Sequence, residues 1–488
     1  MTASTRTKDR DPVTVTTQFD IPDVLESLAA FEILPEWLAA GMSGTRVGTS
    51  LEQHAAPLAD GSLTLLSCTP KRLRAKGEEW IPRYELMVAA PGGEPEPLVL
   101  VGRLWAPGQT PPESVTSPSS DTDPWTCWLP DLGLELHAEE SDDALPALST
   151  LTDPALAARF LEPLIRAAGY TDATIESCET NVVRYKPTSR CTTVVPITYA
   201  KGTTGPSPVV LKTHVGDKGS TAWVAMRELW DRPETWRDTV LLAEPLAFDE
   251  EEKILVQGPI PEAMTLKELA RNAIREGDPE MLDTLREELA KTGRALAAIH
   301  ASGAVYERVA TFEDELAEVQ DVIDRLALTV PSLRGSGAAL LESLAAAGRQ
   351  EPAEAHVPAH HDFRPAQVLL HDGDVGFIDF DGAAMAEPAL DLGRFRAKLR
   401  DIGISTLTFK GEPLSGEPLA ANLALLDDLC DTFLHAYQEH GTVSTRRVLL
   451  WEACDLMTGM LHAWTKVRLM RLDPRLVILK RQLEMLAG

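Results

Sequence analysis

Cysteine is scarce in this chain, and no two cysteines have the spacing of a metal-binding or redox pair. The 488 residues include six cysteines, none of them in a C-x-x-C motif. This pattern fits neither a disulfide-stapled secreted domain nor a zinc site. We therefore expect free thiols in a reducing, cytoplasmic compartment.

Long apolar runs are missing as well. No uninterrupted apolar stretch approaches the ~18 residues that would span a bilayer, so we expect no membrane segment. The opening stretch Met1–Arg10 lacks the apolar core of a signal peptide. Both features favour a cytoplasmic protein.

Basic residues are outnumbered by acidic ones. The chain has 46 Lys and Arg against 74 Asp and Glu, a formal net charge of −28. A surface this acidic repels phosphate backbones, so we expect no nucleic-acid partner. A small anion such as ATP could bind only where local basic groups and a metal ion reverse the field.

The rest of the composition is that of an ordinary globular protein of several domains. Apolar residues make up 44% and charged residues 25% of the chain. Its length corresponds to about three domains. A Pro-, Ser- and Thr-rich stretch at 107–126 is either a linker or a surface loop within one domain.

Hydrophobic patterning separates a strand-rich part of the chain from a helix-rich part. Residues 180–260 have strand patterns with one helix, whereas helical patterns dominate residues 263–488. Asp153-Pro154 and Asp278-Pro279 combine a capping side chain with proline at the first helical position, so each predicts a helix start. This order of elements predicts an α+β fold.

A weak internal repeat connects the first 150 residues with the strand-rich part. Leu73-Arg-Ala-Lys76 and Val183-Arg-Tyr-Lys186 each follow a Ser-Cys pair, and each precedes a strand, a Gly/Pro loop and a second strand. The repeat is either a degenerate second copy of one lobe or a chance similarity between two meanders. As a copy, it would place Arg103 where the later segment carries Lys212.

The most informative stretch combines His360-His-Asp-Phe-Arg-Pro-Ala-Gln367 with Phe377-Ile-Asp-Phe-Asp381. The apolar runs between them flank turn residues 371–374, which predicts a hairpin that pairs Leu370 with Val375. Such a hairpin would bring three oxygen-bearing side chains together, those of Asp362, Gln367 and Asp379. Oxygen ligands of this kind suit Mg²⁺, which commonly keeps one or two protein carboxylates and completes its shell with phosphates and water.

These motifs resemble those of the aminoglycoside phosphotransferase and choline kinase superfamily, which is protein kinase-like. Residues 360–367 resemble the catalytic loops H-R-D-L-K-P-E-N and H-G-D-x-H-x-G-N. Residues 378–381 resemble D-F-G or I-D-W/F, and Glu387-Pro-Ala-Leu-Asp391-Leu-Gly resembles D-P-A-x-D-L. The resemblance covers about residues 175–470.

The resemblance implies a bilobal protein kinase-like fold. The strand-rich small lobe would occupy residues 151–262 and the helical large lobe, with the catalytic loop, residues 263–488. Residues 1–150 would form an extra N-terminal cap domain, as in maltokinase-like members.

Matching positions imply roles for the residues of the large lobe. Asp362 would be the catalytic base, His360 a structural loop residue, and Arg364 a group near the γ-phosphate. Asp379 would be the principal Mg²⁺ ligand, with Gln367 as a second metal contact where most members carry Asn.

Two further aspartates of the large lobe match the motifs less closely. Asp381 stands in place of the glycine of D-F-G. Asp391 would be a structural or substrate-loop carboxylate.

In the small lobe, the resemblance implies the nucleotide contacts. Val209-Val-Leu-Lys212 resembles V-A-I-K, so Lys212 would bind the α- and β-phosphates, with Glu228 on the next helix as its ion-pair partner. No G-x-G-x-x-G motif precedes it, and Lys186-Pro-Thr-Ser-Arg-Cys191 occupies that turn instead. The hinge that meets adenine would contain Gln257, Gly258 and Ile260.

These assignments imply an ATP- and Mg²⁺-dependent phosphotransferase. Its acceptor would be the hydroxyl of a small molecule: a sugar, an amino sugar or an aminoglycoside-like natural product. Two alternatives stay open, a peptide Ser/Thr kinase of a biosynthetic cluster and a nucleotide-binding pseudokinase or scaffold. The sequence does not determine the oligomeric state.

Overall fold

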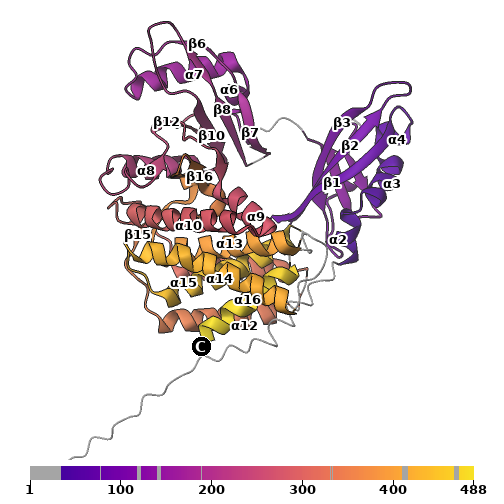
Figure 1. The fold of residues 1–488 in the computed structure, drawn as a ribbon. Coiled ribbons are helices and arrows are strands. Elements are labelled where there is room, and N and C mark those ends of the chain that lie inside the picture. Colours follow the sequence, from indigo (N-terminus) through magenta and orange to yellow (C-terminus); the bar gives the residue numbers. More distant parts are fainter. Residues whose placement is uncertain are drawn as a thin grey trace, which may run out of the picture.

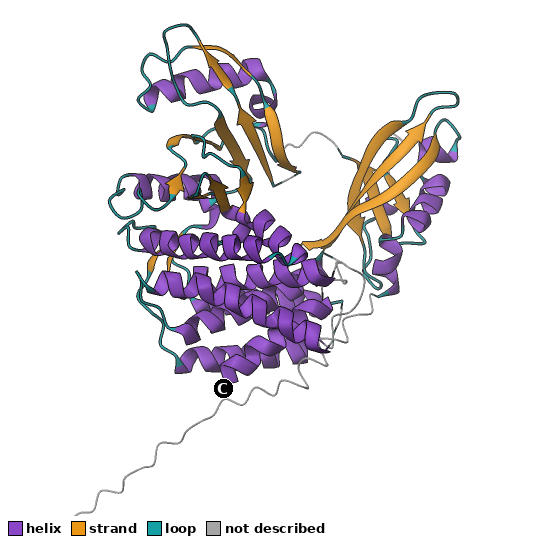
Figure 2. Ribbon diagram, viewed as in Figure 1, coloured by secondary structure: helices purple, strands orange, loops and turns teal. Residues whose placement is uncertain are grey.

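The computed structural model describes residues 35–487 except 77–78, 118–122, 140–143, 188, 330, 332, 409–415 and 467–471. Two strand-rich parts and one helical part follow one another along the chain (Figure 1). Strands concentrate in the first half and helices in the second (Figure 2), which confirms the predicted α+β class. The first 34 residues of the predicted cap lie outside the described part.

The N-terminal part is built on a five-stranded antiparallel sheet. Its core side alternates along β2, where Trp80, Tyr84 and Leu86 are buried and their neighbours are less so. The strands, in the order β1-β2-β3-β5-β4, are β1 (Thr64–Lys76), β2 (Glu79–Ala89), β3 (Glu96–Leu104), β5 (Leu134–Ala138) and β4 (Cys127–Leu129). The helices are α2 (Glu36–Gly41), α3 (Gly44–His54), α4 (Ala56–Ala59) and α5 (Glu113–Thr116).

The next part contains a second five-stranded antiparallel sheet with a core of its own. Its strands, in the order β12-β13-β10-β8-β7, are β12 (Pro245–Asp249), β13 (Ile254–Gln257), β10 (Val209–His214), β8 (Arg190–Val195) and β7 (Asn181–Lys186). Helices α6 (Leu148–Thr152), α7 (Pro154–Ala167) and α8 (Lys218–Trp230) and the strand pair β6 (Ile175–Cys178) and β9 (Ile197–Tyr199) complete it.

The two five-stranded sheets have the same strand order. Numbered within each sheet along the chain, both run first, second, third, fifth, fourth, with a helix between the third and fourth strands. β1 and β7 are therefore equivalent edge strands. This shared order agrees with the internal repeat inferred from the sequence.

The C-terminal part is predominantly helical. Its helices are α9 (Leu266–Glu276), α10 (Pro279–His300), α11 (Phe312–Ala327), α12 (Leu333–Gln350), α13 (Ala389–Thr408), α14 (Gly416–Gln438), α15 (Thr445–Thr465) and α16 (Leu472–Ala487). Four short strands lie between α12 and α13: β15 (Val357–Ala359), β16 (Val368–His371), β17 (Asp374–Phe377) and β18 (Ala384–Ala386). A fifth, β14 (Met264–Thr265), precedes α9 and pairs with β16. A two-residue strand, β11 (Leu241–Leu242), joins β17 in parallel and ties this part to the preceding one.

Two helices begin where their capping residues predict. Asp153 accepts hydrogen bonds from the backbone N–H groups of Ala155 and Leu156 at the start of α7. Asp278 does the same for Glu280 and Met281 at the start of α10. Each carboxylate satisfies N–H groups that have no partner within the helix.

Two expectations from composition can be compared with the structure. The six cysteines are all free. In the described residues, no helix is both long and apolar enough to cross a bilayer.

Candidate active site

The hairpin of β16 and β17 carries the site. Leu370 pairs with Val375 as predicted, and the Ile378 N–H donates to the Gln367 carbonyl at 3.1 Å. The turn is shorter than the four residues expected, because the pairing extends one step further to His371 and Asp374. Asp372 and Gly373 alone make the turn, with φ of 48° and 88°. Two positive φ values match the twist of a two-residue hairpin, which explains the tighter turn.

Asp391 holds the loop that enters the hairpin by hydrogen bonds to its backbone. Its two carboxylate oxygens accept the backbone N–H groups of His360 (2.6 Å) and His361 (2.7 Å), and His300 Nε2 lies 3.1 Å away. Burial raises the pKa of Asp391, but the hydrogen bond and charge of His300 outweigh it and leave the pKa low. Asp391 is fully buried, so it organises the loop from inside the protein.

The loop histidines have packing roles. His360 is buried, stacks near Phe380 and places its Nε2 2.9 Å from the Ile378 carbonyl, which joins the loop to β17. His361 has a φ of 70°, a strained value for a residue with a Cβ. Burial and then the charges of Arg394 and Arg308 lower the pKa of His361 to about 3, so its ring is neutral.

Asp362 is presented to solvent at the top of this loop. Its side chain is 49% exposed, and Oδ2 lies 3.2 Å from both Arg364 Nη2 and Gln367 Nε2. Because Gln367 donates through its amide nitrogen, its Oε1 points elsewhere. That oxygen is buried and has no hydrogen-bond partner. The structure therefore brings Asp362, Arg364 and Gln367 together.

Asp379 follows β17 and faces the strand-rich lobe. Its Oδ1 lies 2.5 Å from Lys212 Nζ on β10, and both side chains are mostly buried. Burial raises the pKa of Asp379, but the charge and hydrogen bond of Lys212 hold it far below its usual range. Asp379 has a φ of 68°, so its backbone is strained at the point where the two lobes meet.

Asp381 contacts two basic side chains of the strand-rich part that sequence reasoning did not identify. Its Oδ2 lies 2.9 Å from His214 Nε2 and 3.8 Å from Arg190 Nη1. Burial raises the pKa of Asp381, whereas the His214 hydrogen bond and the Lys212 charge lower it more. His214 lies two residues after Lys212, and alternate residues of a strand share a face. The two-residue spacing from Lys212 to His214 was the sequence signal that could have identified His214 as a site residue.

The predicted partner of Lys212 is wrong in this structure. Glu228 on α8 pairs instead with Arg232 at 2.7 Å, one helical turn away, and accepts the Val305 N–H. Lys212 pairs with Asp379, which is closer and more buried. A residue motif alone does not reveal which of two carboxylates a flexible lysine contacts.

The residues of the predicted hinge lie at the end of β13 and in the segment that follows it. Gln257 is the last residue of β13, and Gly258 donates its N–H to the Glu244 carbonyl at 2.8 Å. Ile260 packs against Gly376 of β17, where a side chain would clash with it. All three residues precede β14, where the chain enters the helical part, and their contact with adenine stays a prediction.

The donor set fits a magnesium ion that is held jointly by protein and nucleotide. In the described residues no three His, Cys, Asp or Glu side chains form a metal-binding group. Asp379 supplies a charged oxygen, and the buried Gln367 Oε1 lacks a partner that a cation would provide. Mg²⁺ is usually bound by few protein oxygens, and phosphates or waters supply its other ligands.

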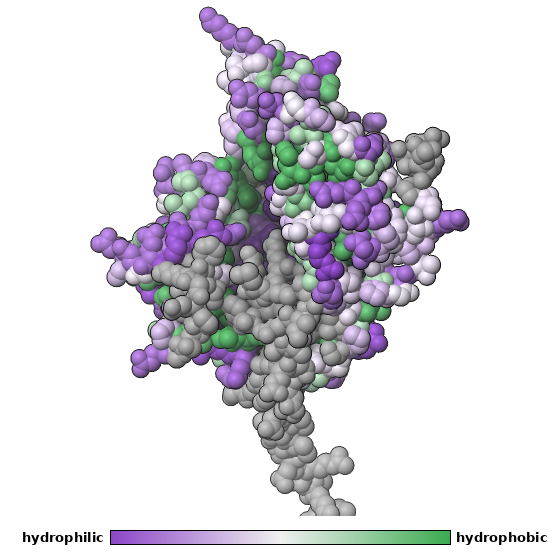
Figure 3. Space-filling view, turned by 90° about the vertical axis from the view of Figure 1, so that its right-hand side faces the viewer, coloured by the Kyte–Doolittle hydropathy of each residue, from purple (hydrophilic) through white to green (hydrophobic). Residues whose placement is uncertain are grey.

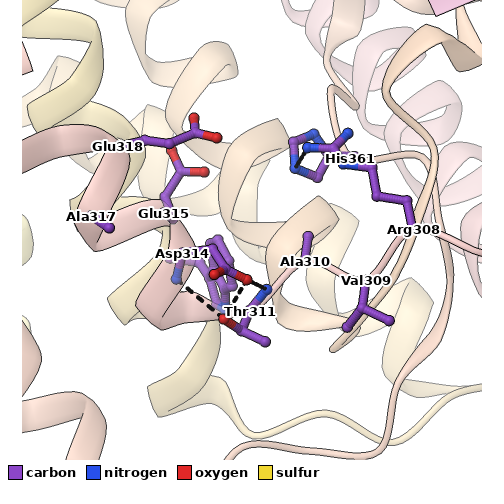
Figure 4. A pocket seen from close by; sticks show the side chains of 10 residues that line it. Arg308, Val309, Ala310, Thr311, Asp314, Glu315, Ala317, Glu318 and His361 are labelled. Carbon is purple, nitrogen blue, oxygen red and sulfur yellow. Dashed lines mark hydrogen bonds between the residues drawn. The ribbon is translucent and has the colours of Figure 1, made fainter. Parts of the chain in front are cut away.

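A pocket lies beside the loop, and several of its polar groups form hydrogen bonds within the protein (Figure 4). Arg308, Thr311, Asp314 and His361 are among its lining residues. Asp314 caps α11 by accepting the Thr311 N–H, and Arg308 donates to the Gly382 carbonyl. These bonds give the pocket a structural role.

On the face of the molecule that carries the N-terminal part, the surface is hollowed, with hydrophilic residues deep in the hollow (Figure 3).

Comparison with known proteins gives one family match. Residues 225–407 match the profile of the phosphotransferase enzyme family. The match begins inside α8 and ends inside α13, so it includes residues 360–381. No relative was found among curated proteins.

Several solved structures are similar to this chain. A choline/ethanolamine kinase family protein from Mesorhizobium loti is 17% identical, with a TM-score of 0.40, over 59% of this chain and 85% of that one. A glucosamine kinase is 16% identical, with a TM-score of 0.43, over 86% and 91%. An aminoglycoside 2′-phosphotransferase is 12% identical, with a TM-score of 0.41, over 67% and 97%.

Proposed function

We propose that this chain transfers the γ-phosphate of ATP to a hydroxyl group of a small molecule. The match of residues 225–407 to the phosphotransferase enzyme family supports this proposal. One arrangement supports the proposal. A solvent-facing carboxylate (Asp362) and a strained, ionised carboxylate (Asp379) emerge from the two ends of one hairpin, opposite a buried lysine (Lys212) of the other lobe.

Asp362 is the proposed base. Its exposed carboxylate can accept the proton of an acceptor hydroxyl while Arg364 and Gln367 hold its orientation. The acceptor oxygen forms a bond to the γ-phosphorus, and the bond from that phosphorus to the β–γ bridging oxygen breaks, leaving ADP. Orienting the hydroxyl contributes directly to rate, because phosphoryl transfer depends mainly on position and charge neutralisation.

Lys212 and Arg364 are the proposed phosphate contacts. Lys212 is held at the lobe boundary by Asp379, and its ammonium can move to nucleotide phosphates. Arg364 borders Asp362 and has a buried Nε with no partner, so its guanidinium can bind the transferring group. Asp379 and Gln367 would hold Mg²⁺, which when bound neutralises phosphate charge.

The test is acceptor-dependent ADP release with ATP and Mg²⁺. The panel contains neutral sugars, amino sugars, aminoglycosides and Ser/Thr peptides, and product mass identifies the phosphorylated compound. Turnover with a sugar or amino sugar that disappears in Asp362→Asn supports the proposal. Turnover with peptides alone would mean a protein kinase. ATP binding without transfer to any acceptor would mean a pseudokinase.

A further inference from the structure

Strand β10 of the small lobe contacts the segment that follows β17 at two points. Lys212 Nζ lies 2.5 Å from Asp379 Oδ1, and His214 Nε2 lies 2.9 Å from Asp381 Oδ2. The two residues of each lobe are two positions apart, and alternate residues of a strand share a face. One face of β10 therefore meets both carboxylates of the segment 379–381.

The second contact is enclosed by protein. The side chain of His214 is 4% exposed and that of Asp381 is 13% exposed. Arg190 is the partner of His214 in the pairing of β8 with β10, and its Nη1 lies 3.8 Å from Asp381 Oδ2. Two basic side chains of adjacent strands thus face one carboxylate across the lobe boundary.

The stability of the fold alone does not explain this contact. His214 Nδ1 and Asp381 Oδ1 are both buried and have no hydrogen-bond partner among the described residues. Buried polar groups that are only partly satisfied cost free energy, whereas apolar side chains of similar shape would not. A histidine and an aspartate at these positions are therefore better explained by a role in the site.

The first contact cannot last through the proposed reaction. Lys212 would turn to the nucleotide phosphates and Asp379 to Mg²⁺, so their direct ion pair would be replaced. Asp379 also has a φ of 68°, and a strained backbone of this kind persists only where surrounding contacts hold it. The contact between His214 and Asp381 uses neither of these two groups, so it can remain when the nucleotide is bound.

We propose that His214 is a positioning residue that holds Asp381 and thereby keeps Lys212 and Asp379 aligned across the lobe boundary once a nucleotide has replaced their ion pair. The proposal rests on the proposed function, because the ion pair is replaced only if this cleft binds a nucleotide with its metal ion. Prior alignment of the two lobes reduces the free-energy cost of ordering the site when the nucleotide binds.

A contact with a purely structural role would behave differently. It would stabilise the free and the nucleotide-bound protein equally, so its loss would lower the melting temperature without changing the affinity for nucleotide. Loss of a positioning contact weakens nucleotide binding, because the site must then be ordered during binding itself.

The test is isothermal titration calorimetry on the full chain with a non-hydrolysable ATP analogue and Mg²⁺. His214→Leu removes the polar contact with Asp381, and we expect it to weaken binding of the analogue by about 10-fold. His214→Gln supplies an amide nitrogen in place of Nε2, so it should recover part of the affinity.

The matched control is Thr213→Val on the same strand. Thr213 is buried on the other face of β10, opposite Cys191 of β8 and Ile254 of β13. This variant alters β10 and leaves the contact between the lobes intact, so its affinity for the analogue should stay near the wild-type value.

Two results would overturn the proposal. The first is wild-type affinity for the analogue in folded His214→Leu. The second comes from combining His214→Leu with Asp381→Asn: if the two losses of affinity add, His214 does not act through Asp381. Should His214→Leu fail to fold, Asp381→Asn tests the same contact from the other lobe, and unchanged affinity there also rejects the proposal.

Failure of the proposed function would be recognised separately. A wild-type chain that binds the analogue but releases no ADP with any acceptor would refute phosphoryl transfer, and the affinities of the variants would still decide the role of His214. A wild-type chain that binds no analogue would refute both proposals. Acceptor-dependent turnover together with unchanged affinity in His214→Leu would reject the positioning role alone.

Discussion

Lys212 Nζ and Asp379 Oδ1 lie 2.5 Å apart, although 167 positions separate the two residues along the chain. The bond connects β10 of the small lobe with the end of β17 in the large lobe. Both groups are mostly buried, so each charge depends on the other for stabilisation. In the proposed reaction the same two groups bind phosphates and a cation.

Removing one member of this pair will destabilise the protein. Asp379→Asn leaves the Lys212 ammonium buried without its carboxylate, which we expect to cost on the order of 3 kcal/mol. Thermal unfolding of the variant measures the loss. Asp379→Asn combined with Lys212→Met removes both charges and should recover part of it. A double variant no more stable than Asp379→Asn would contradict the coupling.

Asp362 should affect catalysis without affecting the fold. Its side chain is half exposed, so Asp362→Asn leaves no buried charge unpaired. We expect kcat to fall by about 10²–10⁴-fold. The melting temperature and the affinity for the ATP analogue should stay near the wild-type values. Full turnover in this variant would remove Asp362 from the mechanism.

Gln367 should determine how strongly the enzyme depends on magnesium. Gln367→Leu removes the unpartnered Oε1 while preserving much of the side-chain volume. We expect a higher Mg²⁺ concentration for half-maximal ADP release, and Gln367→Asn, which keeps an amide oxygen, should be less affected. An unchanged Mg²⁺ requirement in Gln367→Leu would show that this oxygen is not a metal contact.

Asp391 should act through the loop that it fixes. Asp391→Asn replaces one oxygen with a donor nitrogen that faces the His360 or His361 N–H. We expect a lower melting temperature and faster amide hydrogen exchange at residues 360–362. If exchange in this loop were unchanged, another contact would have to hold it in place.

Local signals were sufficient for much of the fold. The aspartates before Pro154 and Pro279 each predicted a helix start, because a capping carboxylate satisfies the first free N–H groups whatever the helix packs against. The pairing of Leu370 with Val375 followed from apolar runs on either side of turn residues. Hairpin register depends on neighbouring residues, so it can be predicted locally.

The contacts between lobes could not be predicted in the same way. Glu228 was expected to pair with Lys212, yet Arg232 lies one turn away on the same helix and binds it instead. His214 and Arg190 reach Asp381 only because two distant segments meet. Which ion pairs form depends on distances that the order of residues does not contain.

Periodicity, turn chemistry and short-range spacing were enough to predict the α+β class, the hairpin and the convergence of Asp362 with Gln367. Packing between distant segments set which side chains meet Asp379 and Asp381: Lys212 for the first, and His214 and Arg190 for the second. Charge interactions act through space and fall off with distance. The arrangement of the lobes, rather than position along the chain, therefore sets their partners.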